Sequence, residues 1–189
     1  MEYKLSATAY ESTFEFHDGR PAAHHIDEDA HRLRFDKTLE FITSVDPDSV
    51  VDLGAGDGGL LSRLGCDSWG YDFHVPNVQY AKQTRNVDVR EVNFVENIDS
   101  IELGSLVVMT EVIEHLEDPH GVLRALASRG PRMIVCSSPV NETDAFHCEE
   151  HVWAWDFEGY EQLLRDSGWE VVRHEVVFPF QVVLANVGS

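Results

Sequence analysis

The sequence predicts an α/β fold built on a doubly wound, mostly parallel sheet of about seven strands, with an antiparallel hairpin at its C-terminal end. Three observations support this prediction. Short apolar runs alternate with helical segments of about ten residues, as units of strand, helix and parallel strand require. The first of these runs stops at a glycine-rich loop. The chain finishes with two strand-like segments, 169–177 and 180–187, that meet around Phe178 and Pro179.

The elements of the first half follow from apolar spacing and from the residues that end each segment. Apolar residues at helical spacing predict a helix over about 28–43, which a proline closes before the strand 49–53. Three leucines predict a helix over 60–64, and a glycine ends it. The next apolar segment, 69–73, is the second strand, and a short helix over 75–82 follows.

The second half continues the same alternation. Alternating apolar and polar residues over 87–94 predict the third strand, and the almost entirely apolar segment 103–110 predicts a buried fourth strand. A helix is expected over 119–128 and the fifth strand over 132–137. The helix expected over 157–167 precedes the terminal hairpin.

Length and composition indicate a single cytoplasmic domain preceded by an arm. Residues 1–30 have weak periodicity and several histidines, which suggests an N-terminal arm or lid, and 31–189 form one domain. We expect a cytoplasmic protein, because the start lacks a signal peptide, no apolar run could span a membrane, and the three cysteines are scattered. The formal net charge of −20 disfavours general binding of nucleic acid.

The most informative motif is the glycine-rich loop at the end of the first strand. Four glycines occupy six positions over 54–59, directly after Asp52 and Leu53, so the backbone there can approach a ligand closely. A second acid, Asp72, ends the next apolar segment near the spacing expected for a ribose-binding carboxylate. These features predict a nucleoside-containing cofactor.

Three motifs in the right order, in 52–58, at Asp72 and in 108–119, resemble those of the class I S-adenosylmethionine-dependent methyltransferases. The resemblance covers roughly 35–189 and implies S-adenosylmethionine as cofactor. It implies that Asp52 and the loop hold the amino-acid part, that Asp72 accepts hydrogen bonds from the ribose hydroxyls, and that Asn93 or Phe94 lies at the adenine. The full set of cofactor-binding residues that it implies is Asp52, Gly54, Ala55, Gly56, Asp72, Phe73, Asn93, Phe94, Thr110 and Glu111.

The segment after the fourth strand is the candidate for more specific chemistry. If a helix begins at Glu111, then Glu111, Glu114 and His115 share one of its faces, where two carboxylates and an imidazole make half of a divalent-metal site. Glu111 and His115 are accordingly the candidate catalytic residues. The arrangement looks like that of the Hen1 family of small-RNA 2′-O-methyltransferases, which implies Mg²⁺ or Mn²⁺ bound by Glu111, Glu114, His115 and His151.

The expected activity is methylation of a small-molecule acceptor on oxygen or nitrogen, because similar motifs occur without a metal in ubiquinone-type O-methyltransferases. The alternatives are a metal-dependent, Hen1-like enzyme that methylates an RNA 3′ end, and a non-catalytic regulatory module that binds the cofactor. An aminopropyltransferase or a nicotinamide-dependent enzyme is a third possibility on the same fold. The loop spacing over 54–58 disfavours the nicotinamide enzyme.

Overall fold

The computed structural model describes residues 1–5 and 29–188. The three histidines within residues 1–30, which are His17, His24 and His25, lie outside this part of the chain. The described strands are β1 (Glu2–Lys4), β2 (Ser49–Leu53), β3 (Asp67–Asp72), β4 (Val89–Glu91), β5 (Leu106–Thr110), β6 (Met133–Pro139), β7 (Trp153–Trp155), β8 (Trp169–Val177) and β9 (Phe180–Val187). The described helices are α2 (Asp29–Val45), α3 (Val75–Tyr80), α4 (Pro119–Ser128) and α5 (Phe157–Asp166). In that part of the chain no helix is long and apolar enough to cross a membrane.

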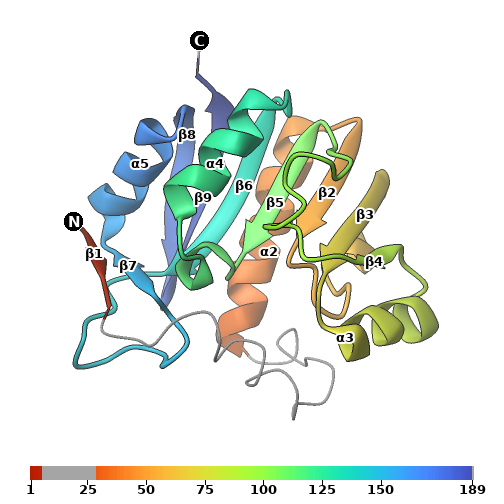
Figure 1. Ribbon diagram of the computed structural model, residues 1–189, viewed down its shortest axis with the longest axis horizontal. Coiled ribbons are helices and arrows are strands. Elements are labelled where there is room, and N and C mark those ends of the chain that lie inside the picture. The colour runs from red at the N-terminus through yellow and green to blue at the C-terminus, as the bar shows by residue number, and fades with distance from the viewer. Residues whose placement is uncertain (6–28, 189) are drawn as a thin grey trace.

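Seven strands form one sheet in the order β4-β3-β2-β5-β6-β9-β8, which confirms the predicted doubly wound fold (Figure 1). The five strands from β4 to β6 are parallel to one another. The chain winds outward in one direction through β3 and β4 and in the other through β5 and β6. The strand order therefore reverses between β2 and β5, where open α/β sheets bind their ligands.

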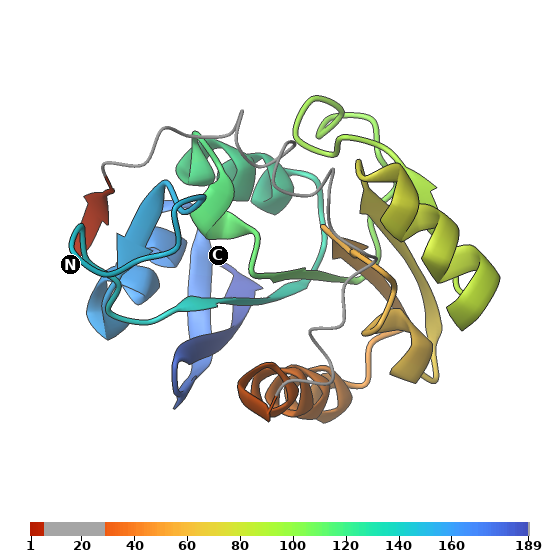
Figure 2. The same cartoon turned by 90° about the horizontal axis from the view of Figure 1, so that it is seen from below.

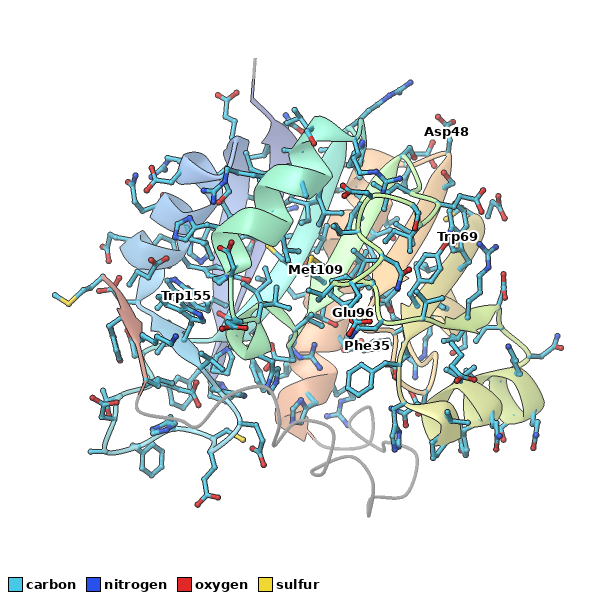
Figure 3. The ribbon with its side chains drawn as sticks, in the orientation of Figure 1. Phe35, Asp48, Trp69, Glu96, Met109 and Trp155 are labelled. Atoms are coloured by element: carbon cyan, nitrogen blue, oxygen red, sulfur yellow. The ribbon has the colours of Figure 1, made fainter. Side chains whose placement is uncertain are left out.

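Helices cover both faces of the sheet, with α2 on one face and α4 and α5 on the other (Figure 2). The alternation of side chains along each strand explains the two layers. On β2, Val50 packs in the cluster that contains Phe41 of α2, whereas Val51 packs in the cluster that contains Leu123 of α4. Met109 of β5 and the ring of Trp155 belong to the cluster that contains Leu123, and both are fully buried (Figure 3).

Three predicted elements differ from the structure. The expected helix over 60–64 is a single 3₁₀ turn, Leu61–Arg63, because the backbone is already extended at Leu64, with a φ of −84° and a ψ of 141°. The expected strand over 87–94 pairs only over β4, since its neighbour β3 offers partners for Val89 to Glu91 alone. The terminal hairpin is expected to add one antiparallel strand at the edge of the sheet, but that strand, β9, lies inside the sheet between β6 and β8, so the edge strand is β8.

A second, two-stranded sheet joins the start of the chain to the segment before α5. β1 pairs antiparallel with β7, with Tyr3 opposite Ala154. The Glu2 carboxylate accepts a hydrogen bond from Trp155 Nε1 at 2.8 Å and contacts His120 Nε2 at 3.1 Å. The sequence did not predict this pairing, because strands of three residues are too short to show a period. It anchors the segment that leads from the candidate site into α5.

Candidate functional site

A cavity of about 970 Å³ opens at the carboxyl ends of the parallel strands, over the point where the strand order reverses. Phe35 of α2 lies beyond the arrowheads of these strands and forms part of the wall (Figure 3). The described residues that line this cavity include all ten predicted cofactor-binding residues, together with His115 and His151. The tertiary structure thus brings together motifs that are separated by up to about a hundred residues in the sequence.

Two glycines of the loop, Gly54 and Gly56, lack a Cβ for different reasons. Gly54 has a φ of +79°, and a Cβ there would lie 2.5 Å from Cγ2 of Val112. Gly56 has a φ of +53°, but a Cβ there would meet nothing within 4 Å and would extend into the space in front of the loop. Gly54 therefore permits packing of the loop against the segment after β5, while Gly56 leaves room for a ligand.

Asp72 closes the loop against the end of β3. Its Oδ2 accepts a hydrogen bond from the Gly56 N–H at 2.8 Å, and its Oδ1 accepts one from the His74 N–H at 2.7 Å. Burial raises the pKa of this carboxyl, although the two backbone donors oppose the shift. Each carboxylate oxygen can accept a second hydrogen bond, so these contacts leave capacity for two ligand hydroxyls.

Asp52 is the most buried acid of the loop region, with 3% of its surface exposed. Among the described residues, no hydrogen-bond donor contacts its Oδ1. Burial, with repulsion from Asp72, raises its pKa from 3.8 to about 7, while the positive charge of Arg34 opposes the shift. A buried carboxylate oxygen without a donor is costly, and a cationic ligand group would remove that cost.

The remaining cofactor-binding candidates occupy the ends of β4 and β5. Asn93 follows β4, and its Oδ1 accepts a hydrogen bond from the Val95 N–H at 3.2 Å. The ring of Phe94 is mostly buried, with 6% exposed, and forms part of the cavity wall. Thr110 is the last residue of β5. The strand order therefore sets out the candidate residues along one line, from β4 through β3 and β2 to β5.

The expected helix at Glu111 is absent from the described structure, and this prediction is wrong. Glu111 has a φ of +58°, and only Ile113–His115 form a single 3₁₀ turn. The Ser137 hydroxyl donates a hydrogen bond to Oε1 of Glu111 at 2.8 Å, which directs that carboxylate toward β6. Burial raises the pKa of Glu111, with Arg34 opposing the shift. Glu111 and Glu114 therefore do not share a helix face.

Three of the four predicted metal ligands lie close together. One ligand atom each from Glu114, His115 and His151 lie within 4.8 Å of one another, whereas Glu111 is outside this group. The Glu114 side chain is fully buried, and among the described residues no hydrogen-bond donor contacts either of its carboxylate oxygens. Burial, with repulsion from Glu111, raises the Glu114 pKa well above its ordinary value. A cation at this point would compensate the buried charge.

Both imidazoles are oriented by oxygen atoms at Nδ1. His115 Nδ1 lies 3.1 Å from the Glu150 carbonyl, which can only accept, so this nitrogen carries the proton. His151 Nδ1 lies 2.6 Å from Oε2 of Glu142. Such contacts leave Nε2 as the basic nitrogen of each ring, as in histidines that bind metals. The donor set of one carboxylate and two imidazoles suits Mn²⁺ or Zn²⁺ better than Mg²⁺.

Two residues of the cavity wall have roles that sequence reasoning missed. Arg34 lies on α2, and Glu142 follows β6. Neither residue belongs to the sequence motif that contains its partner. Each contacts a residue distant in the sequence, Arg34 with Glu111 and Glu142 with His151. No pattern in the sequence predicts such pairs.

The sequence profile of a family described as a methyltransferase domain matches residues 23–174. No curated protein sequence is similar enough to the chain to count as a match. Many solved structures resemble its fold.

One similar structure is the N-methyltransferase NodS from Bradyrhizobium japonicum WM9 in complex with S-adenosyl-L-homocysteine. It is 16% identical, with a TM-score of 0.75 over 94% of this chain and 98% of that one. The methyltransferase domain of a bacterial Hen1, CtHen1-C, is 18% identical, with a TM-score of 0.66 over 85% and 100%. The [4+2]-cyclase SpnF is 11% identical, with a TM-score of 0.72 over 98% of both chains. At these identities, the likenesses establish the fold alone.

Proposed function

The chain belongs to the methyltransferase domain family, and from this premise we propose that it binds S-adenosylmethionine in the large cavity and transfers the methyl group to an acceptor beside Glu111 and His115. The observation that carries the proposal is the single cavity shared by the glycine loop, Asp52 and Asp72. The open space in front of Gly56 and the donor-free Oδ1 of Asp52 fit a cofactor with a polar, cationic group.

The residues of the cavity can contribute to methyl transfer mainly by positioning the cofactor and the acceptor. The bound cofactor would supply an activated methyl group on a sulfonium, and an in-line displacement needs little beyond alignment of the acceptor. Asp72 and the loop backbone would orient the nucleoside part. Glu111, held by Ser137, could accept a proton from the acceptor, since burial raises its pKa above that of an exposed carboxyl.

We propose a small molecule as the acceptor, methylated on oxygen or nitrogen. Acids dominate the part of the wall beyond the loop, with Glu111, Glu142, Asp144 and Glu149 among the lining residues. The chain as a whole carries a formal net charge of −20. Both features oppose a polyanionic acceptor.

The first experiment is a calorimetric titration of the protein with S-adenosylhomocysteine, followed by transfer of labelled methyl groups to a panel of alcohols, catechols and amines. We expect Asp72→Ala to weaken the binding by about 1–3 kcal/mol, because charged hydrogen bonds to the ribose are lost. The failure of wild-type protein to bind S-adenosylhomocysteine would refute the proposal. Binding without transfer to any acceptor would favour a regulatory module, and the resemblance to a [4+2]-cyclase makes this measurement necessary.

A second candidate function is metal-assisted methylation of a vicinal hydroxyl, as in the Hen1-like alternative. The group formed by Glu114, His115 and His151 favours it. A divalent cation held there would lower the pKa of a bound hydroxyl and would offset the acidic wall. The residues fit such an ion, because the Glu114 carboxylate lacks a donor among the described residues and both imidazoles are oriented at Nδ1.

Calorimetric titration of chelator-treated protein with Mn²⁺, in the presence of S-adenosylhomocysteine, tests this candidate. We expect micromolar binding in the wild type and its loss in His115→Ala and in Glu114→Gln. His147→Ala is the matched control, because His147 lines the same cavity but lies outside the three-residue group. Equal binding of Mn²⁺ by wild type and by His115→Ala would show that these residues do not form a metal site. Methylation of a small molecule without a metal would then stand as the proposed function.

A further inference from the structure

The strand β8 lies at one edge of the sheet, and its outer side is open in the described part of the chain. Among the described strands it pairs with β9 alone, and it is nine residues long. An edge strand presents a row of N–H and C=O groups that can pair with a further strand. The side chains of Val172 and Val176 on β8 are 49% and 47% exposed. A long edge strand with exposed valines is a surface to which another strand can add.

The middle of β8 is nearly symmetric in sequence. Residues 171–177 read Val-Val-Arg-His-Glu-Val-Val, so two valines stand on each side of a charged pair centred on His174. If two copies of this segment pair antiparallel around His174, Arg173 of each copy lies opposite Glu175 of the other. Val172 of each copy then lies opposite Val176 of the other. Because a two-fold axis repeats every contact, the pairing contains two ion pairs and two valine pairs.

The charges allow this register and oppose its neighbours. A shift of two residues in one direction places Arg173 opposite its own copy, and a shift of two in the other direction places Glu175 opposite its own copy. Like charges that lie directly opposite each other destabilise a pair of strands. A shift of one residue would turn the side chains to the wrong face of the sheet. The segment therefore specifies one antiparallel pairing with itself.

The ion pairs and the valine pairs lie on opposite faces of the sheet. Arg173 donates a hydrogen bond to Glu40 of α2 at 2.7 Å, so it lies on the face that α2 covers, and Glu175 follows on the same face. The ring of His174 stacks on Phe157 of α5 with a centroid distance of 3.6 Å, so it lies on the other face. Alternation along the strand places the two exposed valines on the face of His174.

An irregularity in β8 limits how far the pairing extends. The register with β9 shifts between Val171 and Arg173, so Val172 is an extra residue on the edge strand. Such a bulge disrupts the ladder beside it. Regular pairing of two copies is therefore confined to the five residues 172–176. An interface of this size is at the small end for proteins, and we expect a dimer that depends on concentration.

The local charge balance favours the approach of a second copy at this edge. The chain has 34 acidic and 14 basic residues, so two copies repel each other over most of their surfaces. Beside β8, however, Lys37 and Arg173 pair with Glu40 and Glu175, and these four charges sum to zero. The side chains of Arg173 and Glu175 are 36% and 38% exposed. Each can therefore also reach an opposite charge across the edge.

We propose that two copies of this chain pair through β8, antiparallel and centred on His174, and thereby join their two sheets into one continuous sheet. Among the described residues that line the cavity, none belongs to β8. The dimer thus leaves the cavity open, and it does not depend on the proposed methyl transfer.

The test reverses the charges across the proposed contact. Arg173→Glu puts an acid opposite Glu175 of the other copy, and Glu175→Arg puts a base opposite Arg173. Analytical ultracentrifugation from about 5 µM to about 500 µM protein, in about 0.15 M salt, measures the dissociation constant of the dimer. We expect wild type to dimerise over this range. Each variant should raise the dissociation constant at least about tenfold, because two cross-strand pairs become repulsive.

A mixture of the two variants restores the opposite charges. In a pair made of one Arg173→Glu chain and one Glu175→Arg chain, an acidic strand faces a basic one at both positions. We expect the dissociation constant of this mixed pair to return to within about threefold of the wild-type value. Arg90→Glu is the matched control, because Arg90 pairs with Asp88 and Glu102 on the other edge strand, β4. It changes the net charge equally and should leave the dimer unchanged.

A second test remains if a charge-reversed variant does not fold, which circular dichroism and thermal melting would show. Val172→Cys and Val176→Cys are mild changes at half-exposed positions. Directly opposite side chains have Cβ atoms about 4.5–5.5 Å apart. We therefore expect mild oxidation of the two variants together to join position 172 of one copy to position 176 of the other, as peptide mass spectrometry would identify.

Three outcomes would overturn the proposal. Wild type could remain monomeric over the whole range of concentration. A wild-type dimer could be insensitive to both charge reversals, which would place the contact on another face. The mixture of variants could fail to recover, which would exclude the antiparallel register. All three leave the proposed function standing, because binding of S-adenosylhomocysteine tests it separately.

Discussion

The substitution Asp52→Asn distinguishes two effects of the buried charge of Asp52: its cost to the stability of the protein and its contribution to ligand binding. The asparagine side chain has nearly the same shape as aspartate, but it cannot ionise. Asp52 is 3% exposed, and burial, with nearby Asp72, raises its pKa from 3.8 to about 7. We therefore expect Asp52→Asn to stabilise the ligand-free protein at neutral and alkaline pH, and to weaken binding of S-adenosylhomocysteine.

The magnitude and its pH dependence follow from the two pKa values. At ~1.36 kcal/mol for each tenfold change in acidity, the difference between 3.8 and about 7 corresponds to about 4 kcal/mol. Below pH 4 the group is neutral in both the folded and the unfolded chain. As the pH rises from 4 to 7, the folded state holds the proton more tightly, so wild type progressively loses stability relative to Asp52→Asn. Above pH 7 the difference stays constant.

Urea unfolding of both proteins at pH 5.5, 6.5, 7.5 and 8.5 provides the measurement. Because the pKa of about 7 already includes the attraction to Arg34, we expect a gain of about 4 kcal/mol at pH 8.5, and roughly half of it at pH 5.5. Calorimetry should show binding of S-adenosylhomocysteine weakened by about 1.5–3 kcal/mol, since a hydrogen bond to a charged group is lost. Equal stability of the two proteins at pH 8.5, or a difference that does not narrow at lower pH, would refute this account of Asp52.

Three further predictions concern the loop, the small sheet and the surface. Gly54→Ala should lower the melting temperature, because its φ of +79° and the 2.5 Å approach to Val112 both oppose a Cβ; an unchanged melting temperature would show that the loop can relax. Glu2→Ala should cost about 1–3 kcal/mol in urea unfolding, since it removes the acceptor of Trp155 Nε1 and the contact with His120, whereas Glu149→Ala, on an outer loop, should cost far less. Raising KCl from about 0.1 M to about 1 M should raise the melting temperature, because salt screens the repulsion in a chain with a formal net charge of −20, and a decrease would show that attractive ion pairs dominate.

Elements with a strong local signal were predicted well. The apolar strands β2, β5 and β6 are buried, and their side chains alternate between two packed layers, so their composition alone reveals them. The glycine loop and Asp72 were also recognisable, because their spacing reflects a connection between adjacent strands. The hydrogen bond from the Gly56 N–H to Asp72, at 2.8 Å, is the physical link between the two motifs.

The predictions failed where the backbone conformation of a single residue, or a pairing partner distant in the sequence, determines the local structure. A helix from Glu111 was expected from the spacing of the acids, but Glu111 adopts a φ of +58° and contacts Ser137 of the neighbouring strand. The pairing of β1 with β7 depends on contacts between residues about 150 positions apart. Helical spacing and strand period describe only near neighbours, so neither outcome could be read from them.

The sequence by itself determined the family resemblance, the parallel sheet and the residues at the ends of its strands, because strands and glycine loops depend on local apolarity and backbone freedom. Only the tertiary structure placed Arg34 of α2 over the cavity and separated Glu111 from the group of Glu114, His115 and His151. These arrangements depend on how a helix crosses the sheet and how a loop returns to it. Packing between distant segments decides both, and no local pattern of residues encodes the result.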